Sequence, residues 1–163
     1  MDSNLKEIKK EVYDKCSLSI SDFIIEPESK EYNACNFKLN GLVIISRSAK
    51  ITPKKAGQFV TFWKRSGNGP IVPLNENDRV DFYIVNVRTG NQFGQFVFPK
   101  SILINKGVIS TNIKEGKRAF RVYPPWDVVE SKQAERSQKW QLNYFYEIGK
   151  ITDFKKVKGL YNV

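Results

Sequence analysis

The chain has 163 residues, 40% hydrophobic and 27% charged, a balance that predicts one folded domain rather than a disordered chain. No apolar run approaches the roughly 20 residues of a membrane-spanning helix, and the N-terminus lacks the apolar segment of an export signal. We therefore expect a cytoplasmic protein with no membrane partner. The absence of histidine excludes Ser-His-Asp and Cys-His catalytic groups, and the two cysteines are expected to be free, buried and without a disulfide partner.

The net charge of +10 is concentrated in the middle of the chain. Residues 32–126 carry 15 Lys and Arg against 4 Asp and Glu, which gives +11, whereas the two ends together carry −1. Like charges crowded on one face destabilise a compact state unless a partner neutralises them. The pattern therefore favours a polyanion, and nucleic acid is preferred to lipid because the cations alternate with strand-like segments. DNA is preferred to RNA. The alternative is a basic protein whose cations are scattered over the surface.

The first two elements have clear patterns. Leu5, Ile8, Val12 and Cys16 follow helical spacing and predict an amphipathic helix over residues 4–16. Asn40-Gly41 lies between two apolar runs and predicts a hairpin of strands 32–39 and 42–47.

The later segments are assigned from β-branched and aromatic content, from glycine and proline, and from apolar spacing. They are a short helical turn at Thr52-Pro53, a strand at 58–64, a central hairpin of strands 81–87 and 93–98, a short helix at 99–106, a strand at 117–123 and a long helix at 130–148. These elements predict a single α/β domain in which an N-terminal and a long C-terminal helix flank a central mixed sheet. Its core covers about residues 5–148, and residues 149–163 are expected to form a basic appendage.

Cationic, amide and aromatic side chains alternate along the basic middle and along the final helix. Lys and Arg supply phosphate contacts, Gln can hydrogen-bond base edges or sugar, and Trp can stack on a base or fill the core. The candidate nucleic-acid contacts are Arg47, Lys50, Lys54, Lys55, Gln58, Lys64, Arg65, Lys100, Lys117, Arg118, Arg121, Gln138, Trp140 and Gln141.

A second group of residues suggests chemistry. Asp81 and Gln95 lie on paired strands and are expected to reach the same end of the sheet, where Glu31 or Glu28 could complete a set of oxygen ligands. Such a set suits magnesium or manganese in phosphodiester hydrolysis, and no cofactor is expected unless the protein is a nuclease. The alternative is a strand-edge Asp in a local ion pair and a hydrogen-bonded Gln.

Several ordered motifs resemble one family over about residues 5–148. They are Arg47-Ser-Ala-Lys-Ile-Thr-Pro53, Gly57-Gln-Phe-Val60, Trp63-Lys-Arg65, Gly94-Gln-Phe-Val-Phe-Pro-Lys100, Gly116-Lys-Arg118, Arg121-Val-Tyr-Pro-Pro-Trp126 and Gln138-Lys-Trp-Gln141. Together they resemble the MepB family of small bacterial proteins, named after a gene beside a multidrug efflux pump.

The resemblance implies a restriction-endonuclease-like fold and, by analogy, nucleic-acid binding. Active members of that wider nuclease class have Asp, then Glu or Gln, one residue, then Lys. Asp81 and Gln95 match the first two elements, but Val97 stands in place of the lysine, which Lys100 or Lys50 would have to replace.

Three hypotheses follow from these patterns. The first is a nucleic-acid-binding protein without catalytic activity. The second is a magnesium-dependent nuclease that uses Asp81, Gln95 and Glu31. The third is an accessory protein, associated with a multidrug efflux system, whose basic face binds an acidic protein.

Overall fold

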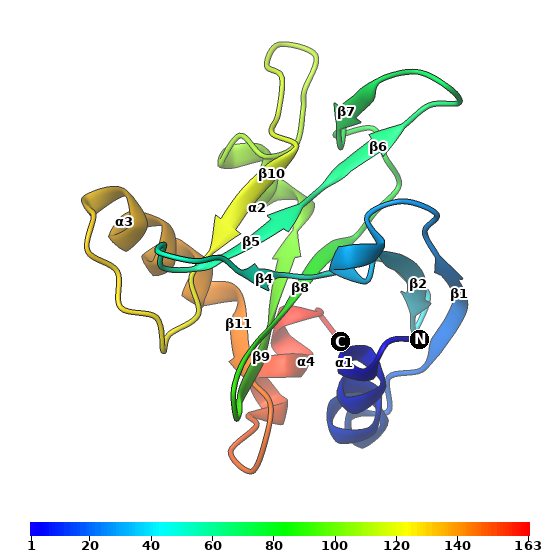
Figure 1. Cartoon of the computed structure of the whole chain (residues 1–163). Coiled ribbons are helices and arrows are strands. Elements are labelled where there is room, and N and C mark those ends of the chain that lie inside the picture. The colour runs from blue at the N-terminus through cyan, green and yellow to red at the C-terminus, as the bar shows by residue number, and fades with distance from the viewer.

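A six-stranded sheet forms the centre of the fold (Figure 1), and the computed structural model describes residues 1–163 without a gap. Its strands, in spatial order, are β1 (Ile20–Ile25), β2 (Cys35–Leu39), β3 (Leu42–Ser48), β8 (Phe82–Thr89), β9 (Gln92–Pro99) and β11 (Phe145–Glu147). Strands β3 and β8 are parallel, whereas the other neighbours are antiparallel. The predicted mixed sheet in a single α/β domain is confirmed, and β8 is a central strand as expected.

One face of this sheet is covered by the two ends of the chain. The N-terminal helix begins as α1 (Ser3–Ile8), capped by Asp2, and continues through a π turn and a 3-10 turn to Cys16. Helix α4 (Phe154–Leu160) packs beside it, with Val157 and the following Tyr161 fully buried. The expectation that residues 149–163 form an appendage is therefore wrong, because this segment completes the core.

The opposite face is covered by a small sheet and two helices. The small sheet has the order β10 (Ala119–Val122), β5 (Gln58–Thr61) and β4 (Lys50–Ile51). Helices α2 (Lys100–Asn105) and α3 (Lys132–Gln141) lie beside it, while β6 (Trp63–Arg65) and β7 (Ile71–Pro73) form a separate hairpin. Figure 1 shows this small sheet in front of the large one, with α3 at its side.

Most sequence predictions of local structure are confirmed. The helix at 4–16, both hairpins, the short helix near 100 and the strand near 119 are all present. In the first hairpin turn, Asn40 and Gly41 have φ angles of +49° and +84°, as an Asn-Gly turn requires. The predicted strand at 58–64 is divided, because Phe62 leaves the small sheet and enters the core.

Two predicted elements are wrong. No helical turn forms at Thr52-Pro53, where the chain makes an irregular loop between β4 and β5. The long helix predicted over 130–148 ends at Gln141, and residues 145–147 form β11 against β9. Gly94 allows this pairing because it has no side chain: a Cβ atom at this position would lie 2.3 Å from the ring of Phe145 and clash with it. Strand pairing thus overrides the helical spacing of the sequence.

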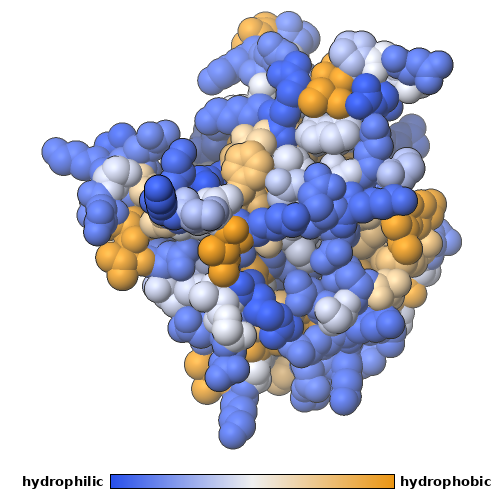
Figure 2. Space-filling view, viewed as in Figure 1, coloured by the Kyte–Doolittle hydropathy of each residue, from blue (hydrophilic) through white to orange (hydrophobic).

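The face of the molecule seen in Figure 2 is mostly hydrophilic. Figure 2 shows blue atoms over most of the visible face, with small and separate orange patches. No helix combines the length and the apolar character that crossing a membrane requires.

Candidate functional site

A cleft of about 960 Å³ opens between the small sheet and α3. Its walls come from the loop between β4 and β5, from the segment after α2, from β10 and from one side of α3. We call it the basic cleft. It is lined by Lys54, Lys55, Ala56, Lys106, Val108, Lys117, Ala119, Phe120, Arg121, Tyr123, Val128, Glu130, Ser131, Gln133, Ala134, Ser137, Trp140 and Gln141.

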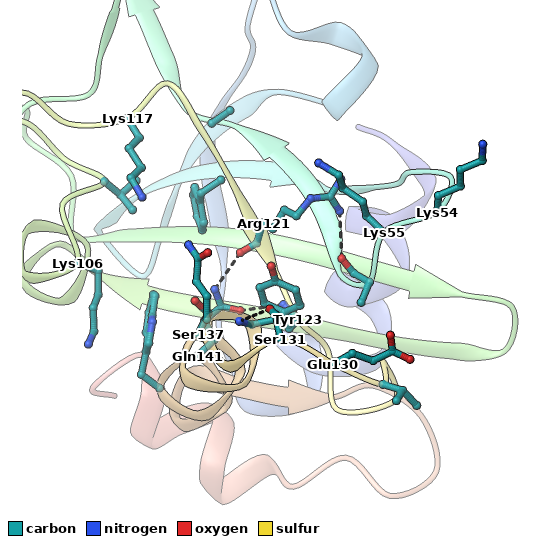
Figure 3. A pocket seen from close by; sticks show the side chains of 18 residues that line it. Lys54, Lys55, Lys106, Lys117, Arg121, Tyr123, Glu130, Ser131, Ser137 and Gln141 are labelled. Atoms are coloured by element: carbon teal, nitrogen blue, oxygen red, sulfur yellow. Dashed lines mark hydrogen bonds between the residues drawn. The ribbon is translucent and has the colours of Figure 1, made fainter.

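The charge of the cleft is strongly positive. Five cations, Lys54, Lys55, Lys106, Lys117 and Arg121, face a single carboxylate, that of Glu130. None of these six side chains forms an ion pair. In Figure 3, Lys54 and Lys55 lie on one side of the cleft, Lys106 and Lys117 lie on the other, and Arg121 and Tyr123 lie between them. The cleft therefore holds uncompensated positive charge from several separate segments.

Two glutamines of α3 hold the cleft wall together. Gln141 is 1% exposed, accepts a hydrogen bond from the Tyr123 N–H at 2.8 Å and donates one to the Arg121 carbonyl at 2.9 Å. Gln138 donates to the carbonyls of Pro124 and Asp127. These amides hold α3 against β10 and the loop that follows it, and a contact between them and nucleic acid stays a prediction.

Arg121 ties the lysine-bearing loop to the small sheet. Its guanidinium donates to the Ala56 carbonyl at 3.2 Å and to the Thr52 hydroxyl at 2.5 Å. Gly57 ends this loop at a φ of +79°, and its N–H donates to the Asp127 carboxylate. A Cβ atom at Gly57 would lie 2.7 Å from the Tyr123 ring, so only glycine fits without displacing the wall.

Asp127 is partly buried behind this loop. Burial raises the pKa of its carboxyl above the usual value, and the hydrogen bond from Gly57 opposes this shift. The loop that carries Lys54 and Lys55 is therefore anchored by a carboxylate that binds a backbone N–H in a poorly solvated place.

Acids outside the cleft neutralise several of the other predicted cations. Those with an acidic partner are Arg47 with Glu26, Lys64 with Asp78, Arg65 with Glu28, and Arg118 with Glu115. Lys50 is exposed and lies over the ring of Tyr32. Because Lys50, Lys64, Arg65 and Arg118 are accessible from solvent, their contact with nucleic acid stays a prediction.

Three predicted contact residues have structural roles. Arg47 is only 2% exposed, and its guanidinium packs over Phe62 while burial lowers its pKa. Gln58 is 1% exposed and donates to the Arg88 carbonyl and the Thr89 hydroxyl. Lys100 donates to the backbone carbonyls of residues 76 and 78. Arg47 and Gln58 are therefore held in the interior, whereas Lys100 is part-buried and a contact between it and nucleic acid stays a prediction.

The predicted nuclease residues do not converge. Asp81 precedes β8, is exposed, and accepts a hydrogen bond from the Val43 N–H at 2.8 Å. Gln95 pairs in register with Asn86, and five residues from Asp81 to Asn86 correspond to roughly 16 Å along a strand. The sequence gives strand pairing correctly but not the end at which each side chain lies.

Glu31 is also in the wrong place for a shared ligand set. It lies in a 3-10 turn next to Tyr32, whose ring packs 6.4 Å from that of Phe59 on the small sheet. Gln95 points to the opposite face of the large sheet, under α1 and α4. No group of three or more His, Cys, Asp or Glu side chains has a geometry that could hold a metal ion. The residues proposed for magnesium or manganese therefore do not fit such an ion.

Gln95 belongs to a fully buried polar network. Its Oε1 accepts hydrogen bonds from the Tyr146 hydroxyl at 2.7 Å and the Tyr161 hydroxyl at 2.6 Å, and its Nε2 donates to Asn86 Oδ1 at 2.9 Å. The Tyr13 and Tyr161 hydroxyls lie 2.7 Å apart. Burial raises the pKa of all three tyrosines well above the usual value. This network joins both ends of the chain to the central hairpin.

Both cysteines are buried, as expected, and neither forms a disulfide in this structure. Burial raises the pKa of the Cys35 thiol to about 12 and raises that of Cys16.

Three functional candidates were missed from the sequence. Lys106 caps α2, Tyr123 follows β10, and Glu130 precedes α3, yet all three line the basic cleft. Lys106 had a detectable signal, since a lysine just before Gly107 is typical of a helix end.

The fold and this cleft define a small mixed α/β domain with a cationic hollow between a subsidiary sheet and a helix. A family model described as MepB-like matches residues 26–147, and the chain belongs to that family. It is 34% identical to a protein whose solved structure is named "Crystal Structure of MepB", with a TM-score of 0.77 over 90% of this chain and 97% of that one.

A weaker structural likeness is to the bacterial homing endonuclease I-Ssp6803I, at 16% identity and a TM-score of 0.42 over 85% of this chain and 82% of that one. A likeness at this level does not define an activity. Comparison with curated proteins gives no significant match.

Proposed function

We propose that this protein binds nucleic acid, DNA in the first place, in the basic cleft. The observation that carries the proposal is the unpaired charge of the cleft: five Lys and Arg side chains against one carboxylate, none of them in an ion pair. Charges held together in this way favour binding of a polyanion, because phosphates replace the missing counter-charges and release condensed cations from the nucleic acid.

The composition of the cleft favours binding with little sequence preference. Four of its five cations are lysines, which act as point charges toward phosphates. Of the two glutamines that line the cleft, Gln141 is committed to backbone groups of the protein, which leaves Gln133 as the one glutamine amide free to reach a base edge. Phosphate contacts position a nucleic acid without reading its sequence. We therefore expect similar affinity for unrelated sequences of equal length.

The experiment measures the affinity of labelled DNA by fluorescence anisotropy over a range of salt concentrations. The plot of log K against log salt is expected to have a negative slope of about 0.7 to 0.9 per phosphate contact. Lys55→Gln and Lys117→Gln should each weaken binding and make the slope shallower by about one unit. Glu130→Gln should tighten binding, because it removes the only carboxylate of the cleft.

Matched controls remove the same charge elsewhere. Lys10→Gln and Lys155→Gln change exposed lysines near the two chain ends, outside the cleft and without an ion pair. They should leave the slope nearly unchanged. Absence of binding at low salt, or equal losses in the cleft variants and the controls, would refute the proposal. Retention of an acidic protein by a preparation that binds no DNA would instead favour the accessory role.

The proposal contains no catalytic step. The nuclease hypothesis would require oxygen ligands from Asp81, Gln95 and Glu31, and these lie on different faces and ends of the fold. The basic cleft itself offers only Glu130 as a carboxylate.

A further inference from the structure

A second hollow adjoins the basic cleft at Trp140. This hollow, of about 420 Å³, is lined by Lys106, Gln133, Arg136, Ser137, Lys139, Trp140 and Asn143. Four of these residues, Lys106, Gln133, Ser137 and Trp140, also line the cleft, so the two hollows share a wall. We call the two hollows together the trough. It runs from Lys54 and Lys55 across α3 to Arg136 and Lys139, with cations at both ends and an indole between them.

Trp140 contacts the ring of Phe98 and the ammonium of Lys106. Its ring packs against Phe98, with the ring centroids 5.5 Å apart and the planes at 50°. The Lys106 ammonium lies 5.5 Å from the Trp140 ring centroid and forms no ion pair. A cation over an exposed ring is held weakly, and a base stacked on an aromatic side chain is held more strongly. A base can therefore displace Lys106, whose ammonium is then free to pair with a phosphate.

Only an unpaired base can reach this ring. Trp140 lies in the concave wall of the trough and is half-buried, so the face of a base must enter the hollow to stack on it. Bases in a duplex are stacked on each other and present only their edges in the grooves. Alternation of cations with an aromatic platform along a groove is the pattern of proteins that bind single strands.

We propose that the trough binds single-stranded nucleic acid, with one base stacked on the Trp140 indole in the position of the Lys106 ammonium. This inference rests on the proposed function and names its ligand class.

The experiment compares three probes of about 12 nucleotides, a length within the usual site size: a single strand, the matching duplex and a single strand with abasic sites throughout. The wild-type protein should bind the single strand about tenfold more tightly than the duplex or the abasic strand. The abasic strand carries the same phosphates, so this difference measures stacking without altering the protein. An RNA strand of the same sequence shows whether the 2′-hydroxyl changes the affinity.

Protein variants locate the stacking. Trp140→Leu should weaken single-strand binding about tenfold and leave abasic-strand binding within twofold, whereas Trp140→Phe should keep most of the affinity. Thermal unfolding checks that each variant is folded. If Trp140→Leu disturbs the packing on Phe98, Trp140→Phe still tests the stacking, because it keeps an aromatic ring at this position. Trp63→Leu is the matched control, because Trp63 also carries a cation, Arg65, over its ring but lies in another hollow.

The two proposals fail in different ways. If duplex and abasic strands bind as tightly as the normal single strand, or if Trp140→Leu loses no more than Trp63→Leu, the stacking site is refuted while salt-dependent binding in the cleft stands. If no nucleic acid binds, both proposals fall.

Discussion

Replacing Gln95 by alanine should cost about 4 kcal/mol of folding free energy. The substitution leaves two buried groups without a partner, the Tyr146 hydroxyl and Asn86 Oδ1, whereas the Tyr161 hydroxyl keeps its contact with Tyr13. Each unsatisfied buried group costs about 1 to 3 kcal/mol, and the lost side-chain volume adds a cavity. A loss of this size is a large part of the roughly 5 to 15 kcal/mol that stabilises a typical domain.

Urea unfolding followed by circular dichroism measures this loss. Tyr146→Phe removes one donor and leaves Gln95 its bond to Tyr161, so it should cost only about 1 kcal/mol. Gln92→Ala is the control on the same strand, since Gln92 is exposed, and it should change stability by less than about 0.5 kcal/mol. A cost below about 1 kcal/mol for Gln95→Ala would refute the view that Gln95 has a structural role.

Three further predictions concern pH and the loop of the cleft. Burial raises the pKa of the three tyrosines around Gln95, so above about pH 10 these hydroxyls lose their protons in the unfolded state but keep them in the folded state. Deprotonation then favours the unfolded state, and the urea midpoint of unfolding should fall as pH rises above about 10. A raised pKa means that folding disfavours the charged carboxylate of Asp127, so Asp127→Asn should be at least as stable as wild type at pH 7. This advantage should disappear as pH falls toward the ordinary aspartate pKa of about 4, because the wild-type carboxyl is then protonated in the folded state. A variant less stable than wild type at pH 7 would contradict this reasoning. Gly57→Ala should cost about 1 to 3 kcal/mol of folding free energy and weaken DNA binding, because the added Cβ clashes with the cleft wall. Gly90→Ala is the control and should cost less, because φ is also positive there but nothing lies within 4 Å of the added Cβ. Equal costs for the two variants would exclude the clash.

Local structure could be predicted where the signal lies in neighbouring residues. The helical spacing from Leu5 to Cys16 and the Asn40-Gly41 turn gave elements that the structure confirms. The segment 145–147 could not be predicted in this way, because its pairing depends on the space above Gly94 on a distant strand. Long-range packing decided that case against local preference.

The candidate site was predicted only in part for the same reason. Arg47 and Lys117 are both basic residues of the middle segment, but Arg47 faces the interior beside Glu26 and Lys117 faces the cleft. Acids near the N-terminus, such as Glu26 and Glu28, neutralise part of the basic middle, which the charge count alone does not reveal. The excess charge that remains is gathered in the cleft by the packing of α3 on β10.

The parallel pairing of β3 with β8 affects how quickly the domain reaches its final form. These two central strands cannot close as a hairpin, because residues 49–81, which carry β4 to β7, separate them along the chain. Contacts between residues that are distant along the chain pay loop-closure entropy before they gain any packing energy. The junction at the middle of the sheet should therefore form late in folding, and the same crossover that delays it brings Lys54 and Lys55 to the cleft.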